Sequence, residues 1–277
     1  MTQSIEETTA MTDIDRPSRQ PGPTRRAVTA WLAEPAGKAA LLLATGAILT
    51  ITLVVAGVHP VLRMDQAVAQ RLHAAALQYP GLTHTSRIVT DWVVDPWTMR
   101  LLLAAAVVWL WHRRQRLLAL WVACASAAEW ALRSVLRWAI GRDRPEWDRP
   151  VDSADFAAMP SGHAMTAAAT CVLLLWLARI AQLPTALVRI GVTTAAVIIV
   201  AACFTRAFLG VHWLTDTLAG ALLGAAMAAG ATATWRTAGP NSHAARASSS
   251  LLSDDPSRSL PQQPSGRRRK STSQTDV

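Results

Sequence analysis

Three short polar clusters, each at the edge of a long apolar stretch, hold the residues of this sequence best suited to chemistry. The first contains Arg137 and Arg144, seven positions apart, and the second of these is followed by Pro145. A guanidinium group is a planar, permanently charged fork that matches phosphate oxygens two at a time. Pro145 ends any helix and restrains the loop beside Arg144. The cluster indicates an anion site, although an arginine-rich membrane loop more often contacts lipid headgroups.

The second cluster is the run Pro160-Ser161-Gly162-His163, directly before a long apolar segment. Ser161 stands where a helix N-cap is expected, and Gly162 lets the backbone approach a ligand closely. The free N–H groups of the first helical turn point the same way, so this arrangement binds an anion. His163 would stand beside that anion as a proton donor. The alternative is a capped helix start with an incidental histidine.

The third cluster contains Arg206, His212 and Asp216. If the last two lie in a helix, their spacing of four places them on one face. The carboxylate then fixes the tautomer of the imidazole and stabilises its charged form. Arg206 supplies another fork for the same anion. A histidine and aspartate pair is also a common structural hydrogen bond, so this pair alone does not establish a function.

Together the clusters offer a nucleophile, an acid and several cationic forks. Phosphoryl transfer needs little more than charge stabilisation, positioning, a nucleophile and an acid for the leaving group. No carboxylate cluster or Cys/His set has metal-ligand spacing, so we expect no metal and no other cofactor, with arginines in place of the cation.

The elements that must position these clusters are membrane-spanning helices. Of the 277 residues, 51% are hydrophobic and only 16% are charged, and the charges are concentrated outside long apolar runs. We predict an all-α polytopic membrane bundle over residues 37–236, between disordered cytoplasmic tails at 1–36 and 237–277. Its six transmembrane helices are expected at about 39–58, 92 or 97 to 111, 117–136, 164–180, 190–204 and 213–235.

A further helix is expected between the first two spans. Residues 66–79 carry an apolar face at helical spacing, made by Val68, Leu72, Ala75, Ala76 and Tyr79. The pattern is typical of a helix on the membrane surface. An ordinary loop helix packed on the bundle explains it equally well.

The net charge of +9 comes mainly from arginines in the tails and short loops. No basic recognition helix accompanies them, so we expect no nucleic-acid partner. The basic connections at 112–116 and 179–189 share a side with both termini, and the positive-inside rule makes that side cytoplasmic. The three polar clusters then face outward in a multi-pass cell-membrane protein. The outward connection breaks the rule with Arg137, Arg142, Arg144 and Arg149, and anion binding is a reason for their presence.

The motifs Arg137-x6-Arg144-Pro145, Pro160-Ser161-Gly162-His163 and Thr205-Arg206-x5-His212-x3-Asp216 resemble the three-part signature of the type 2 phosphatidic acid phosphatase superfamily. The resemblance covers roughly residues 39–235. Two positions depart from the pattern: Arg137 replaces the usual lysine, and Thr205 replaces the usual serine.

The resemblance implies a role for each matching residue. His212 would be the nucleophile that forms a phosphohistidine, with Asp216 as its orienting partner and His163 as the acid for the leaving group. The implied phosphate-binding residues are Arg137, Arg144, Ser161, Gly162 and Arg206. The family works without a metal.

The predicted function is hydrolysis of the terminal phosphate of a lipid phosphate or diphosphate at the membrane. Phosphatidic acid, phosphatidylglycerol phosphate and a polyprenyl (undecaprenyl) diphosphate all fit the sequence. Transfer to a lipid alcohol and a non-catalytic phosphate-binding protein are the alternatives. Glu129 and Arg133 are interpreted as a structural ion pair, and Arg142 and Asp143 as residues that shape headgroup choice. The sequence predicts no oligomeric state.

Overall fold

The computed structural model describes residues 23–239, so residues 1–22 of the predicted tail at 1–36 and residues 240–277 of the predicted tail at 237–277 lie outside the described residues. The described chain is built from α-helices with one π-helical turn, η1. The helices in chain order are α1 (Pro23–Ala33), α2 (Pro35–Val55), α3 (His59–Gln78), α4 (Pro80–Ile88), η1 (Val89–Val93), α5 (Pro96–His112), α6 (Arg116–Ile140), α7 (Gly162–Ile180), α8 (Thr185–Phe208) and α9 (Leu214–Ala238).

The predicted all-α membrane bundle with six spans is confirmed. Helices α2, α6, α7, α8 and α9, with the stretch Pro80–His112 that ends in α5, are long and apolar enough to cross a bilayer. Helices α6 and α8 extend past the predicted apolar runs at both ends, whereas α2 ends at Val55, before the predicted end at 58. Helix α6 ends at Gly141, whose positive φ of 59° allows the cap N–H to bond the Arg137 carbonyl.

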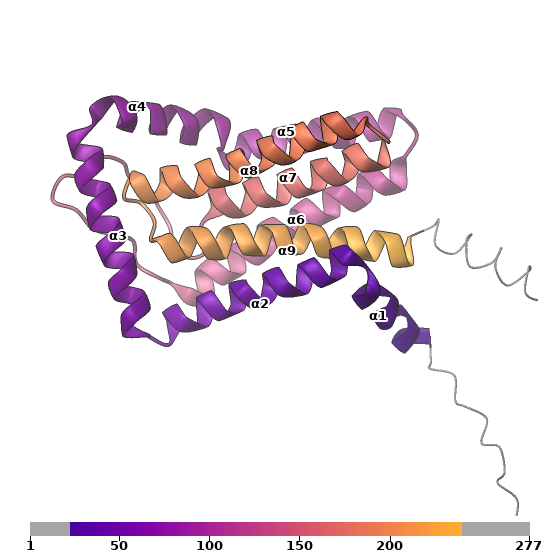
Figure 1. The fold of residues 1–277 in the computed structure, drawn as a ribbon, viewed down its shortest axis with the longest axis horizontal. Helices are drawn as coiled ribbons and strands as arrows, with labels where there is room; N and C mark the ends of the chain where they lie inside the picture. Colours follow the sequence, from indigo (N-terminus) through magenta and orange to yellow (C-terminus); the bar gives the residue numbers. More distant parts are fainter. Residues whose placement is uncertain (1–22, 240–277) are drawn as a thin grey trace, which may run out of the picture. The chain divides into compact units, whose positions relative to one another are not determined.

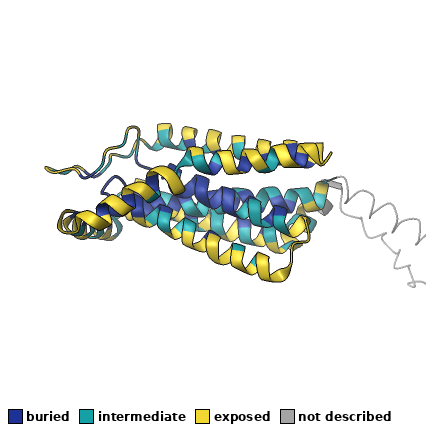
Figure 2. Cartoon of the chain, turned by 90° about the horizontal axis from the view of Figure 1, so that it is seen from above, coloured by how far each residue is buried: buried dark blue, intermediate teal, exposed yellow. Residues whose placement is uncertain are grey.

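Two spans form the centre of the bundle. In their most apolar windows 61% of α7 and 56% of α9 is buried, against 11–22% in the other four (Figure 2). Small residues let these two helices approach closely. A Cβ added at Gly224 of α9 would lie 2.0 Å from the backbone oxygen of Met165 in α7. The remaining spans present large apolar side chains outward, as a lipid-facing surface requires, for example Leu42, Leu101 and Val200.

Helix α3 crosses one end of the bundle, between the ends of α2 and α4 (Figure 1). It packs against α2, α4 and α8, which favours the loop-helix alternative over a helix lying free on the membrane surface. The predicted face is partly wrong, since Tyr79 is 54% exposed. The buried face is rotated from it because polar side chains turn inward to partners: it consists of Asp65, Ala69, His73 and Ala76.

The N-terminal prediction also needs correction. Residues 23–36 were expected to belong to a disordered tail, whereas α1 ends and α2 begins within them. Proline starts both helices, where its missing N–H costs nothing. The indole of Trp31 donates to Thr234 Oγ1 of α9 at 3.1 Å, and Glu34 lies 3.4 Å from Arg236. These contacts to α9 explain why the segment is ordered despite its polar composition.

Candidate active site

The three predicted clusters meet at the end of the bundle that α3 crosses. The backbone N–H of Ser161 donates to the Asp216 carbonyl at 3.0 Å, which joins the start of α7 to the start of α9. Arg137, in the last turn of α6, donates from Nε to the Pro160 carbonyl at 3.2 Å. Connections far apart in sequence therefore share one polar site.

His212 lies in the short connection between α8 and α9 and is 1% exposed. Its Nε2 is 3.2 Å from Arg144 Nη1. Because arginine can only donate, Nε2 accepts and the ring proton resides on Nδ1. Nδ1 faces Asp216 Oδ2 at 3.5 Å, and the Ala158 carbonyl also interacts with the ring. The surroundings thus favour the tautomer with its proton on Nδ1, in which the lone pair of Nε2 is available to react.

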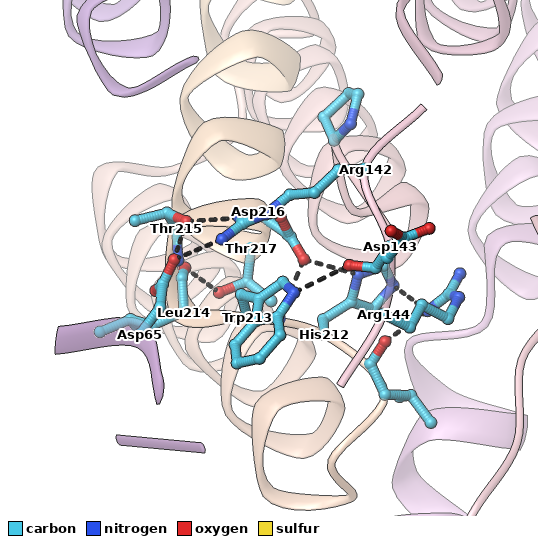
Figure 3. A network of polar contacts seen from close by, with 12 residues as sticks. Asp65, Arg142, Asp143, Arg144, His212, Trp213, Leu214, Thr215, Asp216 and Thr217 are labelled. Carbon is cyan, nitrogen blue, oxygen red and sulfur yellow. Dashed lines mark hydrogen bonds and ion pairs between the residues drawn. The ribbon is translucent and has the colours of Figure 1, made fainter. Parts of the chain in front are cut away.

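Both carboxylate oxygens of Asp216 are held in place. Oδ2 accepts the backbone N–H of Trp213 at 2.9 Å, and Oδ1 accepts from Arg142 Nη1 at 2.5 Å (Figure 3). The residue is fully buried in the first turn of α9. The group behind the imidazole therefore has a fixed orientation, as a residue that sets a tautomer needs.

Arg144 is fixed by backbone carbonyls of its own loop and of the α8–α9 connection. Nε donates to Phe156 at 2.9 Å, Nη2 donates to Asp155 at 3.0 Å, and Nη1 also donates to Val211. Neutral acceptors leave the positive charge of the guanidinium available to a ligand beside His212.

Arg206 ends α8 in the same region and is 5% exposed. Its Nη1 is 3.3 Å from Asp152 Oδ2, while its buried Nε has no hydrogen-bond partner among the described residues. The sequence did not identify Asp152, which stands in a loop of several acidic residues with no distinguishing spacing.

Gly162 accommodates two arginines of α6. A Cβ added there would lie 2.6 Å from Arg133 Nη1 and 3.0 Å from Arg137 Nη2. The space beside Gly162, where the sequence predicted that a ligand approaches the backbone, therefore contains two cationic side chains at the N-terminus of α7. Arg133, one turn before Arg137, was not predicted as part of this group.

The proposed ion pair between Glu129 and Arg133 has different contacts from those expected. Glu129 accepts from Thr166 Oγ1 at 3.1 Å and faces Arg100 Nη2 at 3.9 Å. Arg133 still interacts with it electrostatically but extends toward Gly162. The one-turn spacing correctly predicted that Arg133 offsets the charge of Glu129. The contact with Arg100 on α5 depends on helix packing, which the spacing does not reveal.

Ser161 occupies the predicted N-cap position, with φ −65° and ψ 122°. Its side chain makes no capping hydrogen bond, and its buried Oγ has no partner in the part of the chain described. His163 is half-buried in the first turn of α7, close enough to interact electrostatically with His212 and Arg206. Every residue predicted for catalysis or phosphate binding thus lies in this region.

Burial and neighbouring charge determine the ionisation of the loop residues. Burial, reinforced by Arg144 and Arg206, lowers the pKa of His212 well below 6.5. Burial and then Arg206 lower the pKa of Arg144 to about 10, which still leaves it charged at neutral pH. A neutral imidazole next to the charged guanidinium groups of Arg144 and Arg206 is suited to attack an anion.

Arg142 and Asp143 were predicted to shape headgroup choice. Arg142 instead lies between Asp216 and Asp65, and the Asp143 carbonyl accepts from Trp213 Nε1 at 2.9 Å. Asp65, on α3, was missed. The sequence held one indication of its role: Asp65 is an acidic residue next to the apolar face of the helix predicted at 66–79.

Comparisons with known proteins agree with this arrangement. Residues 116–240 match the sequence profile of the PAP2 superfamily. No curated protein matches the chain. The crystal structure of a transmembrane PAP2-type phosphatidylglycerolphosphate phosphatase from Bacillus subtilis superposes with a TM-score of 0.59 at 23% identity, covering 67% of this chain and 92% of that one. This likeness shows a shared fold. The similarity to the PAP2 superfamily thus covers residues 116–240, somewhat less than half of the chain.

Proposed function

We propose that this protein is a membrane phosphatase that hydrolyses the terminal phosphate of a lipid phosphate or lipid diphosphate. The observation that carries the proposal is His212, a neutral imidazole with Nε2 beside Arg144 and Nδ1 facing Asp216. The match of residues 116–240 to the PAP2 superfamily and the fold shared with a phosphatidylglycerolphosphate phosphatase support it.

In the first step, His212 Nε2 attacks phosphorus while the bond from phosphorus to the leaving oxygen breaks. His163 gives its proton to that oxygen, so the product leaves as an alcohol or a lipid phosphate. The ring becomes cationic as the N–P bond forms, and Asp216 stabilises this charge. Arg137, Arg144, Arg206, Ser161 and the backbone at Gly162 hold the phosphoryl oxygens.

In the second step, water attacks phosphorus and the N–P bond breaks. His163, now neutral, takes a proton from the water, and phosphate leaves. Both histidines return to their starting states, so the cycle balances without an external acid, base or metal.

A cavity between α5 and α6 suits the lipid part of the substrate. It has a volume of about 480 Å³ and is lined almost entirely by apolar side chains, with Arg100 as its charged member. Arg100 faces Glu129, which interacts with Arg133 at the phosphate region. An apolar chain in this cavity would therefore lie beside Arg100, which Glu129 connects to Arg133.

The proposal includes the orientation. The basic connections and both described ends lie opposite the site, so the site faces outward if the basic side is cytoplasmic.

Phosphate release by the purified protein tests the function. Phosphatidic acid, phosphatidylglycerol phosphate and a polyprenyl diphosphate are supplied in detergent, with and without chelator, and we expect release from at least one in both conditions. Labelled substrate should leave an acid-labile phosphohistidine that is absent in His212→Ala. His112→Ala, which removes an exposed histidine at the opposite end, is the matched control.

Three results would contradict parts of the proposal. Full activity of His212→Ala excludes the assigned nucleophile. Phosphate transfer to an added lipid alcohol in preference to water makes the protein a phosphotransferase. No release from any substrate makes it a phosphate-binding protein without this activity.

A further inference from the structure

Arg142 connects two buried carboxylates from different helices. Its Nη1 donates to Asp216 Oδ1 at 2.5 Å, and its Nη2 donates to Asp65 Oδ2 at 2.8 Å (Figure 3). Asp65 is 1% exposed and Asp216 is fully buried. A single arginine therefore supplies the positive charge that both carboxylates need away from water.

Asp65 also caps the helix that carries Asp216. Its Oδ1 accepts the backbone N–H of Thr215 at 3.0 Å, and its Oδ2 accepts the Thr215 hydroxyl at 2.5 Å. Thr215 is the second residue of α9, where N–H groups have no partner within the helix. The preceding Trp213 has no oxygen in its side chain, so the cap comes from α3 instead.

These contacts leave little freedom for the catalytic pair. Thr215 is adjacent to Asp216 in sequence, and Arg142 Nη1 bonds Thr215 Oγ1 at 2.8 Å as well as Asp216. The guanidinium also lies over the Trp213 ring, 5.4 Å from its centroid. Arg142 thus anchors the Asp216 carboxylate, and Asp65 anchors both Arg142 and the backbone of the adjacent Thr215.

Helix α3 is attached to the site by a second contact. The His73 ring stacks on Trp147 with centroids 4.0 Å apart and planes 11° apart. Trp147 Nε1 donates to the Gly210 carbonyl at 2.8 Å, two residues before His212. The same face of α3 therefore holds both the loop after α6 and the connection that carries the nucleophile.

We propose that Asp65 is a positioning residue: through Arg142 and Thr215 it orients Asp216, and through Asp216 the imidazole of His212. The proposal rests on the phosphatase function above. Asp65 contacts no residue that we assign to phosphate binding, so its loss should slow the chemical step and leave substrate binding nearly intact.

The test measures kcat and KM for Asp65→Asn and Arg142→Lys. Asparagine has the same shape but turns N–H groups toward Arg142, and lysine keeps the charge but has one nitrogen in place of the two that bond Asp216 and Asp65. We expect kcat to fall about 10- to 100-fold in each variant, with KM within about threefold of wild type. Labelled phosphohistidine should form more slowly by the same factor as kcat.

Ala76→Gly is the structural control. It weakens α3 on the same buried face without touching a polar group of the site. We expect it to lower thermal stability while kcat stays near the wild-type value. An equal loss of kcat in Ala76→Gly and Asp65→Asn would show that general loosening of α3 causes the effect, which overturns the proposal.

A double variant tests the route of action. If Asp65 acts through Asp216, Asp65→Asn should cause almost no further loss of kcat in an Asp216→Asn background. Losses that multiply would overturn the positioning role, as would a wild-type kcat in Asp65→Asn, while the phosphatase function stands. A wild-type protein that releases no phosphate from any lipid overturns both.

Discussion

At the scale of single residues, the site contains more positive charge than its sequence motifs account for. Arg133 joins Arg137 at Gly162, and Arg206 faces Asp152 with its Nε unpartnered among the described residues. The missing side chain of Gly162 is what lets the two α6 guanidinium groups reach the first turn of α7. Small changes there should affect ligand affinity before they affect folding.

We expect Gly162→Ala to weaken substrate binding. The new methyl would meet the flexible ends of Arg133 and Arg137 at 2.6 and 3.0 Å, so these groups move aside and the protein still folds. Loss of one charge-assisted hydrogen bond corresponds to an increase in KM of about tenfold or more. Gly81→Ala, with nothing within 4 Å, is the control. An unchanged KM and an unchanged affinity for inorganic phosphate would contradict the assignment.

The pH dependence of kcat/KM should report the charge around His212. Burial, followed by Arg144 and Arg206, holds its pKa below 6.5, so the neutral nucleophile persists into mildly acidic solution. Removing a positive charge in Arg206→Gln makes protonation easier and raises that pKa. The acid limb of the profile should therefore move to higher pH in the variant. Ionisation of the substrate is identical in both proteins and cancels in the comparison. A limb that stays in place or moves to lower pH would refute this account.

At the scale of elements, the close contact between α7 and α9 aligns the two helix starts that form the site. Gly220 lies against the Ser161 backbone and Gly224 against Met165, so the small residues of α9 set the distance between the helices. His163 lies in the first turn of α7 and Asp216 in the first turn of α9, and their relative position follows from this packing.

Gly224→Ala should destabilise the protein. The added methyl would stand 2.0 Å from a backbone oxygen, which cannot rotate away as a side chain can, so α7 and α9 must separate. We expect a loss of about 1–3 kcal/mol in the free energy of unfolding, measured by denaturant titration in detergent. Gly230→Ala, where the nearest atoms are at 3.8 and 3.9 Å, should be neutral or slightly stabilising. Equal effects of the two changes would contradict this explanation.

The sequence predicted the membrane-spanning helices well, because the length of an apolar run is enough to identify them. Six spans followed from runs that a bilayer requires, and the motif residues converged as their positions at span ends indicated. Contacts between distant segments were not predictable. Arg142 bonds Asp65 across 77 positions, and no periodicity in either segment records that pairing. The order of α1 likewise depends on contacts with α9, which the polar composition of its segment does not reveal.

At the scale of the whole described chain, the bundle is polarised. The α5–α6 and α7–α8 connections lie at one end, and α3 lies at the other with the α6–α7 and α8–α9 connections (Figure 1). The basic connections are therefore separated from the polar site by the length of the bundle.

The proposed orientation can be measured by labelling. In a cysteine-free background, Ser153→Cys in the α6–α7 connection and Arg114→Cys in the α5–α6 turn are both at exposed positions. An impermeant thiol reagent should label only the first in intact cells and both after permeabilisation. Labelling of only Arg114→Cys in intact cells would place the site on the cytoplasmic side.

The burial of α7 and α9 has a consequence for the bilayer around the protein. Lipid chains meet mainly the outer spans, whose windows are 11–22% buried, while the two central helices are more than half enclosed by protein. Hydrophobic mismatch acts on the helices that touch lipid, which tilt or shift to match the local thickness. The outer spans can tilt or shift in this way while α7 and α9 keep their positions relative to each other. Turnover should then vary less with membrane thickness than the stability of the bundle does.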